Sequence, residues 1–170
     1  MSKKILILGL GRHGKDTVAE YLNVKYGMSF TSSSMFAAEK FIYDSLKEVL
    51  GYGTFQECYC DRHNWRELWY QMIKAYNIKD KARLVKYVLD SGYDIYVGLR
   101  DDKELYEAKK QNLFDLVLWV DAEERLGVTE DSSSCKVTSS DADKVIYNNG
   151  SLEDLHHEVD KLMEDNGCLL

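Results

Sequence analysis

The chain has 170 residues, of which 45% are apolar and 30% charged, and its formal net charge is −7. This length fits one domain with a sizeable core, so we expect residues 1–170 to fold as a single domain. The apolar runs are much shorter than the ~20 residues that span a bilayer, and the N-terminal run is too short for a signal peptide. We therefore expect a cytoplasmic protein without a membrane partner. The acidic balance argues against a nucleic acid polymer as partner, although a few local cations would suffice to bind a small anion.

The first third of the chain predicts a strand, a glycine-rich loop, a helix, a strand and a helix, in that order. A short buried strand covers residues 4–8, and a helical pattern of apolar residues begins at residue 15 and stops at Gly27. Residues 28–31 predict a second short strand, and the three serines that follow can cap a helix over residues 35–50. Residues 51–60 contain two glycines and predict a loop.

The middle of the chain predicts two successive helices, after which strands and helices alternate again. The helices cover residues 61–76 and 79–90, and a strand follows over residues 94–99. A helix over residues 101–111 then precedes another buried strand over residues 116–121.

The C-terminal part begins with a polar, serine-rich segment over residues 122–142, which we predict to be a mobile lid. A short strand over residues 144–147, a turn over residues 148–150 and a helix over residues 152–163 follow. Strands that alternate with helices predict an α/β fold of three layers, in which a mostly parallel central sheet is covered by helices on both faces.

The strongest local signal is the loop between the first strand and the first helix. Its glycines and lysine have the spacing of a Walker A loop. Glycines let the backbone wrap closely around phosphate oxygens, the helix N-terminus adds positive potential, and the lysine supplies a cation for the β- and γ-phosphates. The residues that we predict to bind the nucleotide here are Gly9, Gly11, Arg12, His13, Gly14, Lys15, Asp16 and Thr17.

The loop departs from the pattern at Asp16, which stands where a Ser or Thr usually contacts Mg²⁺. Asp16 is our predicted metal ligand, either directly or through water, because carboxylates suit Mg²⁺. The alternative is an acid that only favours the first turn of the helix. A glycine-rich turn with an exposed lysine is a further alternative. A dinucleotide fingerprint over residues 9–14 is a weaker rival, since residues 28–34 lack the acid expected about 20 residues on.

Three segments in the same order resemble the phage-type deoxynucleoside monophosphate kinases. Residues 14–17 are similar to the phosphate loop of that family, and residues 96–104 to a strand end that carries an arginine with an acid four residues later. Residues 143–155 are similar to its C-terminal strand, Asn-Gly turn and helix, a segment shared with other small P-loop kinases such as the dephospho-CoA kinase-like proteins.

The resemblance implies a P-loop nucleoside-monophosphate-kinase-like fold, ATP with Mg²⁺ as phosphoryl donor and a deoxynucleoside monophosphate (dNMP) as acceptor. It assigns Lys15 and the loop glycines to ATP, Arg100 to a phosphate, and Asn148 or Asn149 to the surroundings of the adenine. The chain departs from the family at Gly98, where an acid usually stands two residues before the arginine.

Arginines outside the loop are the candidates for holding the acceptor, because phosphoryl transfer depends on positioning and charge neutralisation. Arg62 and Arg66 lie about one helical turn apart, as a phosphate clamp or as surface arginines beside a buried tryptophan face. Arg100 follows a strand at its carboxyl end, where α/β sheets place ligands, and Glu104 is a candidate to orient it. Arg125 is either a lid arginine or an ordinary surface residue.

Ser33 and Ser34 complete the predicted acceptor site, which comprises Ser33, Ser34, Arg62, Arg66 and Arg100. The predicted catalytic residues are Lys15, Arg66 and Arg100. We therefore expect a kinase that converts ATP and a dNMP to ADP and a dNDP. The alternatives are a P-loop kinase of another small acceptor, such as dephospho-CoA, and a catalytically impaired nucleotide-binding protein. A homodimer is compatible with the sequence.

Overall fold

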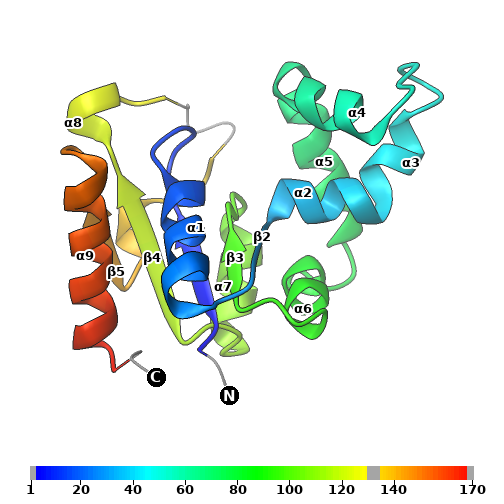
Figure 1. The fold of residues 1–170 in the computed structure, drawn as a ribbon. Coiled ribbons are helices and arrows are strands. Elements are labelled where there is room, and N and C mark those ends of the chain that lie inside the picture. The colour runs from blue at the N-terminus through cyan, green and yellow to red at the C-terminus, as the bar shows by residue number, and fades with distance from the viewer. Residues whose placement is uncertain (1–2, 130–134, 168–170) are drawn as a thin grey trace.

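The computed structural model describes residues 3–129 and 135–167. Within these residues, five strands form one sheet in the order β2-β3-β1-β4-β5, and every neighbouring pair is parallel (Figure 1). The strands are β1 Ile5–Leu8, β2 Phe30–Ser32, β3 Ile95–Val97, β4 Leu116–Asp121 and β5 Lys144–Tyr147. The predicted α/β class and parallel central sheet are confirmed.

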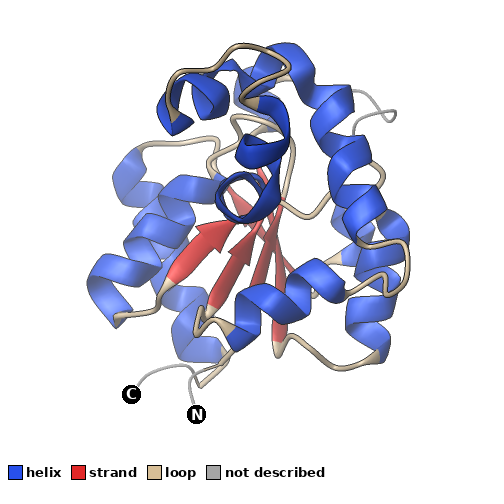
Figure 2. Ribbon diagram, turned by 90° about the vertical axis from the view of Figure 1, so that its right-hand side faces the viewer, coloured by secondary structure: helices blue, strands red, loops and turns tan. Residues whose placement is uncertain are grey.

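Helices cover both faces of the sheet (Figure 2). The α-helices are α1 Lys15–Tyr26, α2 Ser33–Ala37, α3 Tyr43–Leu46, α4 Phe55–Asp61, α5 Arg66–Tyr76, α6 Arg83–Asp90, α7 Asp102–Lys110, α8 Glu123–Leu126 and α9 Leu152–Asp165. A π-helical turn, η1 Ala38–Ile42, joins α2 to α3, and short 3₁₀ turns lie at η2 Arg62–Trp65 and η3 Ser139–Asp141. None of the described helices is long and apolar enough to cross a membrane.

Successive residues of a strand point to opposite faces of the sheet, and because helices cover both faces, the strands contribute to two hydrophobic clusters. In β1, Ile5 and Ile7 join a hydrophobic cluster with α1 and α9, whereas Leu6 and Leu8 join a second cluster with α2, α5, α6 and α7. A strand buried on both faces reads as a continuous apolar run, which is why β1 and β4 are recognisable from the sequence.

The segment between β2 and β3 is helical and lies to one side of the sheet, where α2, α3, α4 and α5 gather (Figure 1). The predicted loop over residues 51–60 is wrong in its second half, because α4 begins at Phe55. Thr54 and Glu57 form a capping box, in which the Thr54 hydroxyl accepts from the Glu57 N–H and the Glu57 carboxylate accepts from the Thr54 N–H. The pattern Thr-x-x-Glu is a helix-start signal, so the sequence contained the information that would have corrected this prediction.

The serine-rich segment over residues 122–142, predicted as a lid, lies partly outside the described residues, at 130–134. Its described ends are attached to the rest of the molecule. Cys135 and Val137 are buried in the cluster that contains Leu6 and Leu8. The Thr129 hydroxyl donates to the carbonyl oxygen of Gly11 at 2.6 Å.

Candidate active site

The carboxyl ends of the parallel strands meet at one edge of the sheet, and each is followed by residues that the sequence singled out. The glycine-rich loop follows β1, Ser33 follows β2, Arg100 follows β3 and Asn148 follows β5. Open parallel sheets place ligands at this edge. The topology therefore gathers residues that are more than 130 positions apart in the sequence.

The loop backbone has the conformation that its glycines permit. Gly9 has φ 145° and Gly14 φ 100°, both outside the region favoured by residues with a side chain. A Cβ at Gly9 would lie 2.5 Å from the carbonyl oxygen of Val120, and one at Gly14 would lie 2.4 Å from Nδ2 of Asn148. Both positions therefore require glycine, because the backbone angle disfavours a side chain and a Cβ would clash with neighbouring atoms. Arg12 also has a left-handed φ of 65°.

Lys15 begins α1 and curls back over its own loop. Its Nζ donates to the carbonyl oxygen of Leu10 at 2.7 Å, and the residue is only 9% exposed. Asp16, next to it in the first turn, is exposed. Both side chains line the cavity described below, together with Gly11 and Arg12. The loop therefore presents a cation and a carboxylate to the same space.

His13 and Asn148 fasten the loop to the neighbouring strands. The His13 ring is 1% exposed, and its Nδ1 accepts from the Ala122 N–H while its Nε2 donates to the Gly127 carbonyl oxygen. The Asn148 Nδ2 donates to the His13 carbonyl oxygen at 2.9 Å. The His13 side chain therefore points into the protein, so any contact of this residue with a nucleotide would come from its backbone. Arg125 lies on the same side, where its Nε donates to the Asn148 carbonyl oxygen at 3.2 Å.

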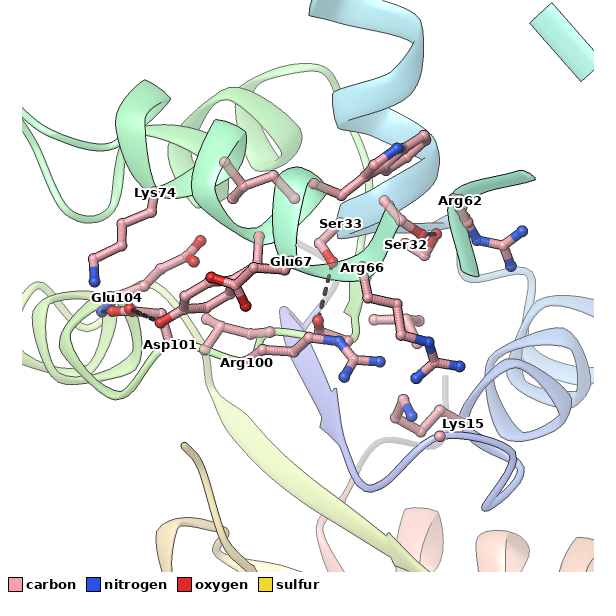
Figure 3. A pocket seen from close by; sticks show the side chains of 18 of the residues that line it. Lys15, Ser32, Ser33, Arg62, Arg66, Glu67, Lys74, Arg100, Asp101 and Glu104 are labelled. Carbon is pink, nitrogen blue, oxygen red and sulfur yellow. Dashed lines mark hydrogen bonds between the residues drawn. The ribbon is translucent and has the colours of Figure 1, made fainter. Parts of the chain in front are cut away.

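A cavity of about 400 Å³ extends from the loop to the space between α5 and α7, and we call it the central cavity. One end is cationic: Arg62, Arg66 and Arg100 line it together with Lys15. Figure 3 shows the Arg66 and Arg100 side chains pointing toward Lys15. The structure thus brings together all three predicted acceptor arginines and the loop lysine, which come from α1, η2, α5 and the loop after β3.

Arg62 is held in place by its surroundings. Its Nη1 donates to the Tyr59 carbonyl oxygen at 2.8 Å, and its guanidinium lies over the Tyr59 ring at 4.0 Å from the centroid. Stacking on an aromatic face leaves the edge of a guanidinium free to meet a planar or tetrahedral anion. Arg62 belongs to a 3₁₀ turn and Arg66 begins α5, so the predicted continuous helix over residues 61–76 is divided there.

Ser33 and Ser34, which the sequence predicts to bind the acceptor, also line the cavity. Ser32 is the N-cap of α2, with its Oγ accepting from the Met35 N–H. The Ser33 hydroxyl donates to the Gly98 carbonyl oxygen at 2.9 Å, which ties the end of β2 to the end of β3. Gly98 has φ 88°, so an acid at this position would require a strained backbone.

The other end of the central cavity is lined by acids, a tyrosine, an asparagine and a lysine, Lys74. Asp101 is the N-cap of α7, with its Oδ1 accepting from the N–H groups of Lys103 and Glu104. The Asp101 Oδ2 accepts from the Tyr70 hydroxyl at 2.8 Å. Asn77 and Glu104 lie beside them, 3% and 4% exposed. Figure 3 shows Asp101, Glu104 and Lys74 at the end opposite Arg66 and Lys15.

The pKa values of Asp101 and Glu104 are shifted in opposite directions. Burial opposes the ionisation of Asp101, but hydrogen bonds from Tyr70 and from the helix N–H groups outweigh it and lower its pKa. Burial raises the pKa of Glu104 to about 8, and the nearby charge of Asp101 acts in the same direction. Two neighbouring acids whose pKa values differ in this way are typical of functional sites.

Asn77 and Tyr70 were not among the predicted site residues, and Glu104 was predicted only as a helper of Arg100. The sequence placed Glu104 four residues after Arg100 as a candidate to orient that arginine, whereas its described hydrogen bonds come from Tyr96 and Asn77. Tyr96 offered one signal, since its hydroxyl lies in an apolar strand and must find a polar partner when buried. Asn77 lies at the C-terminal end of α5, and no pattern in the sequence marks it as a site residue.

No protein-family model matches the chain, and no curated protein matches it. Solved structures do match over nearly the whole length. TT1252 from Thermus thermophilus has 18% identity and a TM-score of 0.52, with 97% of this chain and 98% of that one covered. Shikimate kinase from Aquifex aeolicus has 12% identity and a TM-score of 0.50, with 96% and 98% covered. At such identities the similarity establishes the fold alone.

Proposed function

We propose that the chain is a P-loop kinase that transfers the γ-phosphoryl group of ATP to a dNMP, giving ADP and a dNDP. One observation carries this proposal: the loop lysine and the three predicted acceptor arginines line the same cavity. The donor phosphates would lie on the loop, and the acceptor phosphate would lie among the arginines. The two reacting groups would then meet between Lys15 and Arg66, whose side chains approach each other from opposite walls (Figure 3).

The chemistry asks little of the protein beyond position and charge. The transferring phosphoryl group spreads negative charge over its oxygens in the transition state, and catalysis consists mainly of aligning it and neutralising that charge. Lys15 would serve the β- and γ-phosphates once its Nζ leaves the Leu10 carbonyl oxygen. Arg66 and Arg100 would hold the acceptor phosphate in line, because guanidinium groups pair bidentately with phosphate.

A Mg²⁺ ion fits the residues around the loop. Asp16 is an exposed carboxylate on the cavity wall beside Lys15, and oxygen donors of this kind are what Mg²⁺ prefers. We therefore assign Asp16 as its protein ligand. When bound, the ion would neutralise charge on the β- and γ-phosphates.

The size and shape of the central cavity support a nucleoside monophosphate as acceptor. Its volume of about 400 Å³ lies within the range of small-molecule sites. Apolar side chains, Trp69, Ile73 and Leu99, also line it, so a flat, weakly polar group would be accommodated there. A second candidate is a kinase of a small carboxylate. The similarity of the fold to that of a shikimate kinase suggests this second candidate. The arginine cluster would bind a carboxylate as well as a phosphate.

The test is ADP release from ATP and Mg²⁺ against a panel of dNMPs, NMPs, dephospho-CoA and shikimate. We expect turnover with at least one dNMP and a loss of about 100-fold or more in kcat for Lys15→Ala. Lys161→Ala, which removes an exposed lysine from α9, is the matched control and should behave as wild type. Turnover with shikimate alone would favour the second candidate. Unchanged turnover in a folded Lys15→Ala variant would contradict both.

A further inference from the structure

Glu104 is a buried carboxyl group on the wall of a ligand-sized cavity. It is 4% exposed, and it lines the central cavity at the end away from the loop. Within residues 3–129 and 135–167, no lysine, arginine or histidine forms an ion pair with it. Burying an acid without a cationic partner costs stability, so a folded chain retains one mainly where it has a task.

The groups that hold Glu104 leave part of its hydrogen-bonding capacity unused. The Tyr96 hydroxyl donates to Oε1 over a long 3.3 Å, and the Asn77 side chain also bonds to the carboxyl group. Asn77 is itself fixed, because its Oδ1 accepts from the Leu84 N–H at 2.9 Å and its amide NH₂ is thereby left to donate. Whether ionised or protonated, a carboxyl group has more hydrogen-bonding positions than these two donors occupy.

Asp101, the other carboxyl group at this end, already has its hydrogen-bond partners. Both oxygens of Asp101 accept hydrogen bonds, from Tyr70 and from the first turn of α7. Asp101 is therefore a structural acid that fixes the helix start and the position of Tyr70. Glu104 is the carboxyl group here that retains capacity toward the cavity. Because its pKa lies at about 8, it is mostly a neutral acid at pH 7, with one O–H donor beside one carbonyl acceptor.

We propose that Glu104 is a specificity-determining residue that pairs with the hydrogen-bonding edge of a nucleobase, where an N–H donor adjoins an acceptor atom. The apolar walls formed by Trp69, Ile73 and Leu99 would receive the base, and the arginines at the other end would receive its phosphate. This inference rests on the proposed function for the phosphate end and deepens it by naming the group that reads the acceptor head. A sugar phosphate or a hydroxy acid lacks the planar edge on which an N–H donor adjoins an acceptor atom.

Two variants of Glu104 test the pairing. Glutamine keeps a donor beside an acceptor on a side chain of the same length, whereas leucine removes both. Affinities for dCMP, dAMP, dGMP and TMP would be measured calorimetrically without ATP, with deoxyribose 5-phosphate as the probe that has no base. Glu107→Leu, at a half-exposed carboxylate on the same helix, is the control.

We expect Glu104→Leu to weaken the best-bound dNMP by about 10-fold to 100-fold, the effect of losing a pair of buried hydrogen bonds. Glu104→Gln and the control should stay within about threefold of wild type, which is less than the loss of one typical hydrogen bond. Affinity for deoxyribose 5-phosphate should be the same in all four proteins. Circular dichroism would verify that each variant is folded.

The outcomes separate this inference from the proposed function. Equal dNMP affinity in wild type and Glu104→Leu would overturn the inference and leave the kinase proposal intact. A matching loss for deoxyribose 5-phosphate, or an equal loss in Glu104→Gln, would also overturn it. A wild-type protein that binds no dNMP more tightly than deoxyribose 5-phosphate would do the same. Base-dependent binding that Glu104→Leu abolishes, without turnover of any acceptor, would contradict the kinase proposal alone.

Discussion

Replacing Glu104 by glutamine should stabilise the unliganded protein, and the gain should depend on pH. Glu104 has a pKa of about 8 in the folded chain against 4.5 when unperturbed. Folding therefore favours the protonated form of Glu104. Below pH 4.5 its titration does not lower the free energy of unfolding, and as the pH rises toward 8 it lowers that free energy increasingly. Each tenfold change in proton affinity is about 1.4 kcal/mol, which gives a penalty of about 1 kcal/mol at pH 5 and about 3 kcal/mol at pH 7. Glutamine stays neutral and can accept the same hydrogen bond from Tyr96.

Urea unfolding at pH 5, 7 and 8 measures this difference. The free energy of unfolding of Glu104→Gln should exceed that of wild type by an amount that grows across the series, and the slope with urea should be unchanged. Comparing the two proteins at each pH cancels the other titrating groups. Glu107→Gln is the control and should show no such trend. A Glu104→Gln variant that is less stable than wild type at pH 8 would refute the reasoning, since it would mean that the ionised carboxylate is stabilised in the fold.

Three further changes address the loop and the cavity wall. Gly14→Ala should lower the free energy of unfolding in urea by about 2–3 kcal/mol, because its φ is 100° and the new Cβ would collide with Asn148; a loss under about 0.5 kcal/mol would contradict this. Asp16→Asn should raise the Mg²⁺ concentration for half-maximal turnover about tenfold, the effect of losing about 1.4 kcal/mol, and should not alter thermal stability; an unchanged Mg²⁺ dependence would remove Asp16 from the metal site. Trp69→Phe should change the free energy of unfolding by less than about 1 kcal/mol, because the buried indole N–H has no partner among the described residues and its removal offsets the lost packing; a loss above about 3 kcal/mol would mean that the N–H is satisfied.

The order and type of the sheet elements could be predicted because their signals are local. Strands β4 and β5 lie where the apolar runs predicted them, and α1 begins at Lys15 and stops at Gly27. The helical region between β2 and β3 was harder to predict. There a capping box creates α4 inside a glycine-containing stretch, and α6 begins at Arg83, four residues later than predicted. Asp80 accepts from the Ala82 N–H and holds those residues in a turn.

The sequence alone determined the glycine-rich loop between β1 and α1, which we propose to bind phosphate, since its spacing, its preceding strand and its following helix are contiguous and depend on glycine conformations and helix geometry. It also identified the arginines one by one, because a cation at a strand end or helix start is visible in a linear pattern. Only the tertiary structure decided that Arg62, Arg66 and Arg100 share one cavity with Lys15, and that His13 turns into the protein. Above all, it decided the state of Glu104. The ionisation of a carboxyl group depends on what surrounds it, and Tyr96, Asn77 and Asp101 meet there only after β3, α5 and α7 have packed together.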